Sequence, residues 1–138
     1  MNTRLLILVI WTLSGALLIK LARAWPTLPG RVATHFGVRL QPDGWSSKGV
    51  LAAMILVAVL GQAALATFVL LHVDGAASPA GVVLLVVNVA LVSALWQTIN
   101  YNAKGTQFQP AWIFGPIIVL LAAIALALAG GLLHYHWR

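Results

Sequence analysis

The polar chemistry of this chain is concentrated in Leu28-Pro-Gly-Arg-Val-Ala-Thr-His-Phe-Gly37 and, a little further on, in Gln41-Pro-Asp-Gly-Trp-Ser-Ser-Lys48. These two segments hold a histidine, an aspartate and two basic residues, Arg31 and Lys48. An apolar run of membrane length lies on either side of them. Any activity beyond spanning a bilayer is therefore expected to start in this loop, residues 25–47.

The rest of the chain has the composition of a membrane protein. Among its 138 residues, 62% are hydrophobic and only 7% are charged, far from the balance of a soluble domain. The uncharged runs are Leu5–Ile19, Gly49–His72, Pro79–Tyr101 and Ala111–His136. Since about 20 helical residues cross a bilayer core, we predict an all-α integral membrane protein. Its single domain, 1–138, has four transmembrane helices, near 4–24, 48–72, 79–101 and 111–135.

The first span has one alternative interpretation. Arg4, the apolar core after it and Ala22-Arg23-Ala24 resemble a cleavable signal peptide. Lys20 and Arg23 argue against cleavage, because they separate the apolar core from the small residues. We therefore expect a retained first helix, with both cationic side chains reaching toward the interface.

Charge predicts the orientation in the membrane. Four spans would place both termini and the 73–79 turn on one side, with Arg4 and Arg138. The opposite side would carry the remaining basic residues, Lys20, Arg23, Arg31, Arg39, Lys48 and Lys104. The positive-inside rule then puts the long loop in the cytoplasm and the termini outside. We expect a multi-pass protein of the bacterial inner membrane, and Trp25, Trp45, Trp96 and Trp112 as its interfacial belt.

The long loop is expected to be ordered and extended at the membrane interface. Val32, Thr34, Phe36 and Val38 alternate with other residues, which predicts a short strand. Gln41-Pro42-Asp43-Gly44 suits a type I turn, and Ser46 or Ser47 can cap the second helix. We expect residues 25–48 to pack on 100–110, with Phe36 or Trp45 near Tyr101 or Phe108.

The loop's ionisable residues admit two interpretations. His35 is either a proton-linked or ligand-contacting imidazole beside Asp43 or Lys48, or a side chain that bonds loop backbone and fixes its shape. We favour the second, with Asp43 as a turn and capping residue and Lys48 bound to lipid phosphate. The loop residues carried forward as candidates are His35, Phe36, Gly37, Pro42, Asp43, Gly44, Trp45 and Lys48.

Other chemistry is scarce. The chain has no cysteine, so thiolate metal ligands and cysteine nucleophiles are excluded. Asp43 and Asp74 are predicted on opposite sides, which leaves no carboxylate pair. His134 and His136 point apart on a helix, although His72 is expected at the same end, and we predict no metal site and no cofactor. The net charge is +6. The basic residues border apolar runs, which favours anionic lipid headgroups over nucleic acid as their partner.

Two polar residues lie near the middle of predicted spans. Gln62 belongs to the second span and Asn88 to the third, at similar predicted depth. An interhelical hydrogen bond between them is the expected role. No ionisable residue lies deep within a span, so a coupled transport pathway is not favoured.

The loop motif resembles a known but uncharacterised bacterial membrane domain. The residues that carry the resemblance are Leu28-Pro29, Val32, Thr34-His35-Phe36-Gly37, Pro42-Asp43-Gly44-Trp45 and Ser47-Lys48. The domain is found at the N-terminus of SdpI-type bacteriocin-immunity proteins and in small stand-alone membrane proteins. Relatives often have proline at the position of Ala33 and glycine at that of Leu40. The full-length immunity proteins also have further C-terminal helices, for which this sequence shows no counterpart.

These observations predict a small non-enzymatic membrane protein that acts through its loop, with an immunity-like or signalling role. One alternative is an accessory subunit of a larger membrane complex, with a membrane protein as partner. A transporter or membrane enzyme is the remaining alternative.

Overall fold

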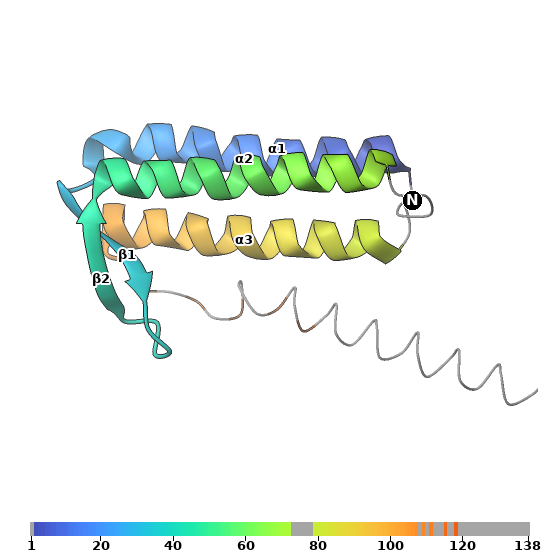
Figure 1. Ribbon diagram of the computed structural model, residues 1–138. Helices are drawn as coiled ribbons and strands as arrows, with labels where there is room; N and C mark the ends of the chain where they lie inside the picture. The colour runs from blue at the N-terminus through green and yellow to red at the C-terminus, as the bar shows by residue number, and fades with distance from the viewer. Residues whose placement is uncertain are drawn as a thin grey trace, which may run out of the picture.

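The computed structural model describes residues 2–72 and 79–107, together with 109, 111, 115 and 118. These residues form three long helices, which lie side by side in Figure 1 with a β-hairpin across one end. The elements in chain order are α1 (Thr3–Ala24), the 3-10 turn η1 (Trp25–Thr27), β1 (Arg31–Phe36), β2 (Pro42–Ser47), α2 (Lys48–His72) and α3 (Pro79–Lys104).

The three helices are each long and apolar enough to cross a membrane. In the most apolar window of each, only 28% of the residues are buried within the protein. Most of their apolar side chains therefore face outward, where lipid can cover them. The first three predicted spans are confirmed as helices, and α3 continues past the predicted end at 101 to Lys104. The predicted fourth span, 111–135, lies almost entirely outside the described residues.

Short polar residues define the helix ends. Asn2 Oδ1 accepts from the backbone N–H of Arg4 at 2.9 Å and caps α1. Ser47, of the two candidate serines, caps α2 by accepting from the Val50 N–H at 3.3 Å. Gly105 follows α3 with a φ of 67°, the left-handed conformation that commonly ends helices.

The loop between α1 and α2 forms an antiparallel hairpin of β1 and β2, so the protein is mostly helical rather than all-α. The strand expected over 32–38 is present as Arg31–Phe36. The turn expected at 41–44 is wrong: the turn spans 37–41, where Gly37 N–H donates to Gln41 O at 2.9 Å. Leu40 adopts a φ of 55° in this turn, a conformation that favours glycine.

The strand pairing is irregular. Register shifts fall between Ala33 and His35 and between His35 and Phe36. They break the predicted alternation, so Val32 and Ala33 are both buried while His35 is exposed. A bulge of this kind redirects side chains locally, and here it turns His35 outward.

Two apolar clusters form the core of the described helices. One lies toward the N-terminal end and includes Leu6, Ile10, Ala63, Ala66 and Leu70. The other lies toward the hairpin and contains Leu17, Leu21, Leu28, Val32, Leu51, Ile55, Val59 and Ile99. Because Leu28 and Val32 belong to the loop, the inner side of the loop is part of the bundle core.

Candidate functional site

The side chain of Asn102 fixes β1 to the last turn of α3. Its Oδ1 accepts from the Ala33 N–H at 2.7 Å, and its Nδ2 donates to the Ala33 carbonyl at 2.9 Å. The same Nδ2 also donates to the Thr98 carbonyl at 2.9 Å. The carboxamide thus pairs with Ala33 as a neighbouring strand would, and it satisfies a backbone donor and acceptor that are costly to bury alone.

An aromatic contact reinforces this attachment. The rings of Phe36 and Tyr101 meet edge to face, with centroids 5.3 Å apart, a favoured geometry for aromatic pairs. The prediction that the 25–48 loop packs on 100–110 is therefore confirmed. Trp45, the other candidate, is 49% exposed, and Phe108 lies outside the described residues.

His35 and Asp43 form a direct pair on the outer side of the hairpin. His35 Nδ1 and Asp43 Oδ1 are 2.5 Å apart, and their side chains are 74% and 51% exposed. The interpretation favoured by the sequence has His35 bonded to loop backbone and Asp43 capping a turn. The structure instead places Asp43 within β2, between Pro42 and Gly44, which pair with Phe36 and His35 in the strand register. The register shift between His35 and Phe36 leaves Asp43 without a residue opposite it, and its side chain meets His35 across the strands.

Two glycines leave room for this pair. A Cβ on Gly44 would lie 2.7 Å from His35 Cβ, and one on Gly37 would lie 2.9 Å from Asp43 Oδ2. Real Cβ atoms do not approach this closely. The glycine at 44 is thus required by its close approach to His35 Cβ, rather than by the turn predicted at 41–44, whereas at 37 the Asp43 carboxylate could shift to make room.

The remaining motif residues frame the hairpin. Pro42 begins β2 and pairs with Phe36 in register, and Trp45 pairs with Ala33. Lys48 begins α2, and its ammonium lies 4.9 Å from the centroid of the Trp25 ring. This cation–π contact holds the cation at the same end of the bundle as the hairpin.

A hollow of about 340 Å³ lies between the turn and the end of α3. It is lined by Arg39, Leu40, Gln41, Pro42, Tyr101, Gly105 and Gln107. Beside it, the Val38 side chain is fully exposed at 105%. The turn thus presents a cation, an apolar tip and a shallow polar recess close together.

The predicted polar contact between helices is present and involves a third helix. Asn88 Nδ2 donates to Gln62 Oε1 at 2.7 Å and to Ser14 Oγ at 3.4 Å. Asn88 and Ser14 are buried. The network links α1, α2 and α3 near their middles, where polar pairs hold membrane helices together.

The described residues hold no group of three or more His, Asp or Glu side chains placed to bind a metal. His72 lies at the other end of the bundle, where its Nδ1 is 3.0 Å from the Phe68 carbonyl oxygen. His134 and His136 lie outside the described residues. The arrangement at the hairpin can offer one carboxylate, one imidazole and several cations to a partner.

The fold and this site are those of a multi-pass helical membrane protein with a β-hairpin fixed at one end of its helix bundle. The sequence model of a family described as "Domain of unknown function (DUF1648)" matches residues 6–60. The match spans most of α1, the whole hairpin and the first half of α2. No curated protein and no solved structure matches the chain.

Sequence reasoning missed Asn102 and Ser14. Asn102 was assigned to a polar connection, but α3 extends past it and turns its side chain toward β1. The sequence did hold a signal for Asn102. It is a polar residue just after an apolar run, at the membrane surface where a long loop needs partners for its backbone groups. Ser14 gave no such signal, since a serine within a membrane helix usually bonds its own backbone.

Proposed function

We propose that this chain is a small non-enzymatic membrane protein that acts by presenting its hairpin to another protein. The single observation that carries the proposal is the contrast between the two sides of the hairpin. One side is held by Asn102, Phe36 and buried Val32, while the other exposes His35 and Asp43. A rigid support beneath exposed polar groups is the arrangement that binding sites require.

The exposed pair is a poor candidate for stabilising the fold. A surface pair of side chains contributes roughly 0–1 kcal/mol even when both partners are charged, less than the usual cost of overpacking at Gly44. Its position next to the exposed Val38 tip supports a role in recognition. The resemblance of the loop motif suggests an immunity-like role, in which the hairpin acts from the cytoplasmic side on a toxin or a toxin receptor that spans the membrane.

A deletion strain tests the immunity-like form. Cells lacking the gene should become sensitive to a membrane-active toxin, and a plasmid copy should restore resistance. The His35→Ala variant should fail to restore it while accumulating to the normal level. Unchanged sensitivity of the deletion strain across such toxins would reject this form.

The alternative of an accessory subunit has its own support. Only 28% of the most apolar window of each helix is buried within the protein, which leaves apolar faces on which the helices of a membrane partner could pack. Purification in mild detergent separates the alternatives: a subunit should recover a stoichiometric partner complex without any toxin present. A monodisperse chain on its own would argue against it.

For orientation, we propose a bacterial inner membrane with the hairpin in the cytoplasm. The hairpin end carries the basic residues of the loop together with Lys20 and Lys104, whereas Arg4 lies at the other end of α1. Cysteines at Val38, Lys104 and Ala76 can be probed with an impermeant reagent in intact cells. Labelling only at position 76 is expected, and labelling at 38 and 104 but not 76 would reverse the orientation.

A further inference from the structure

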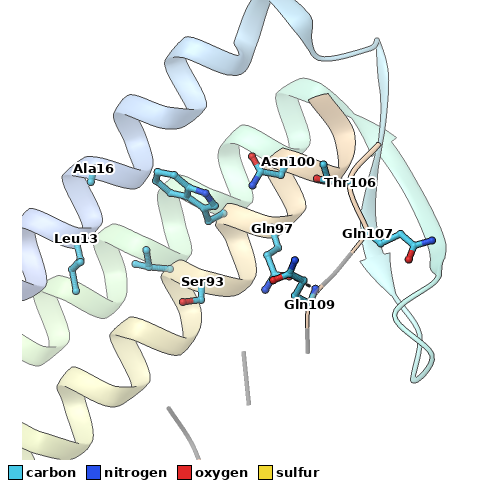
Figure 2. A pocket seen from close by; sticks show the side chains of 10 residues that line it. Leu13, Ala16, Ser93, Gln97, Asn100, Thr106, Gln107 and Gln109 are labelled. Carbon is cyan, nitrogen blue, oxygen red and sulfur yellow. Dashed lines mark hydrogen bonds between the residues drawn. The ribbon is translucent and has the colours of Figure 1, made fainter. Parts of the chain in front are cut away.

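A second feature lies apart from the hairpin motif, between α1 and α3. It is a cavity of about 560 Å³, within the size range of small-molecule sites. Leu13 and Ala16 of α1 and Val92 of α3 line it toward the middle of the bundle. Asn100, Thr106 and Gln107 line it toward the hairpin end, as Figure 2 shows.

The cavity is therefore graded from apolar to polar along the helix axes. Leu13 and Lys20 are seven residues apart on α1, a rise of roughly 10 Å. Ser93 and Lys104 are eleven residues apart on α3, a rise of roughly 16 Å. An amphiphile aligned with a bilayer leaflet has the same gradient over a similar length, since half of a hydrocarbon core is about 15 Å.

Two cations, Lys20 and Lys104, do not line the cavity but follow lining residues by one helical turn on α1 and α3. Lys20 follows Ala16 by one helical turn and shares its face, and its ammonium lies 4.3 Å from the centroid of the Trp96 ring. Trp96 also lines the cavity. Lys104 follows Asn100, which lines the cavity, by one helical turn on α3 and shares its face. The only described carboxylate, Asp43, is paired with His35, so it does not compensate these two cations.

An unused donor points to the same kind of ligand. Gln97 lines the cavity, and its Oε1 accepts from the Gln109 N–H at 2.5 Å. Its Nε2 is buried without a hydrogen-bond partner among the described residues. A buried donor of this kind is costly unless an acceptor reaches it, and the ester and phosphate oxygens of a lipid are acceptors.

We infer that this cavity is a binding site for one anionic phospholipid, whose phosphate lies between Lys20 and Lys104 and whose acyl chain enters between α1 and α3. The Gln97 Nε2 donates to the glycerol or ester region. Charge complementarity selects an anionic headgroup, and the apolar inner end selects a lipid over free phosphate. The inference is independent of the hairpin's proposed partner.

The test titrates the purified full-length chain, in a neutral detergent, with phosphatidylglycerol, and native mass spectrometry counts the bound lipid. One phosphatidylglycerol is expected per chain, and phosphatidylcholine should bind at least fivefold more weakly. Inorganic phosphate at millimolar concentration should not compete. Each lysine near an anionic surface contributes about fivefold in affinity, so Lys20→Gln with Lys104→Gln should weaken binding about 25-fold.

The matched control removes the same charge elsewhere. Arg4→Gln with Arg31→Gln should leave the affinity for phosphatidylglycerol within twofold, because neither side chain lines the cavity and neither lies within a helical turn of a residue that does. Lys104 is exposed, so the Lys104→Gln variant should fold normally. This single change should weaken the affinity for phosphatidylglycerol about fivefold. Leu13→Trp fills the apolar end without altering charge and should also abolish the bound lipid.

Four outcomes would overturn the inference. These are equal losses in the two double variants, wild-type binding in Leu13→Trp, equal affinity for phosphatidylcholine, and competition by inorganic phosphate. If the chain's own residues 110–138 fill the cavity, no lipid will bind, and that result also overturns it.

Discussion

Gly44 shows how a single residue sets the shape of the candidate site. It lies opposite His35 in the strand pairing, where a Cβ would come within 2.7 Å of His35 Cβ. Backbone and Cβ atoms cannot yield as the end of a flexible side chain can. The strands must therefore separate before any side chain larger than hydrogen fits at position 44.

The first prediction compares two glycines. Gly44→Ala should destabilise the protein by roughly 1–3 kcal/mol, the usual cost of overpacking, as measured by thermal unfolding in detergent. Gly61→Ala is the matched control, because a Cβ there meets nothing within 4 Å. In the interior of α2 it should stabilise by up to about 1 kcal/mol. Equal melting temperatures for the two variants would contradict the close approach at Gly44.

Asp43 marks the limit of sequence reasoning at this scale. The residue types of the motif were readable, but an aspartate between proline and glycine has the signature of a turn. Its actual neighbour depends on a bulge at His35, and a bulge depends on pairing between strands that local sequence does not reveal. The candidate residues could thus be named, whereas their pairing could not.

At the scale of elements, the hairpin is attached to α3 through Asn102. Ala33 is buried, and both of its backbone polar groups bond to this one carboxamide. Asn102 thus bonds to β1 and, through its Nδ2, to the Thr98 carbonyl of its own helix. Removing the Asn102 carboxamide leaves the Ala33 N–H and carbonyl without hydrogen-bond partners at a buried position.

The second prediction follows from that attachment. Asn102→Leu should expose the Ala33 amide to exchange and speed deuterium uptake in the peptide covering β1 about tenfold or more, since an unsatisfied buried group costs roughly 1–3 kcal/mol. Hydrogen exchange with mass spectrometry measures this in the full chain. Asn100→Leu, the same change two residues away, should leave uptake in β1 unchanged. Protection of β1 that survives Asn102→Leu would show that the hairpin is held by other contacts.

The helices are joined near their middles by Asn88, Gln62 and Ser14. The third prediction is a coupling energy between Gln62→Leu and Asn88→Leu of about 0.6 kcal/mol, up to roughly 1.7, as found for hydrogen bonds between membrane helices. A double-mutant cycle on unfolding in detergent measures it. Asn88→Leu paired with Val57→Ala, on the exposed face of α2, should show no coupling. Additive effects of Gln62→Leu and Asn88→Leu would contradict the network.

Element positions were largely predictable because hydrophobic length alone determines membrane spans. The apolar runs predicted α1, α2 and α3 closely. Only the first strand of the hairpin was predicted, from the alternation over 32–38. The second strand carries proline, aspartate and glycine, which are depleted in strands, so tertiary packing on α3 overrides local propensity there.

At the scale of the whole molecule, the two ends of the bundle differ in kind. One end carries Asn2 and the start of α1, with few charges. The other gathers the hairpin, Lys20, Lys48 and Lys104, together with the ends of α1 and α3 (Figure 1). The chain crosses from one end to the other in α1, returns in α2 and crosses again in α3, so the ends of α1 and α3 lie together. The polar chemistry of the described residues is therefore concentrated at one membrane surface.

The most direct test of the hairpin's proposed role is photo-crosslinking in living cells. A photoreactive residue at Val38 should yield one discrete protein adduct, reduced at least fivefold by either His35→Ala or Asp43→Asn while the protein level and melting temperature stay unchanged. The same residue at Val57, which faces outward on α2, should not yield that adduct. Protein adducts at position 38 that persist in both variants, or that appear equally at position 57, would contradict recognition through the His35–Asp43 pair.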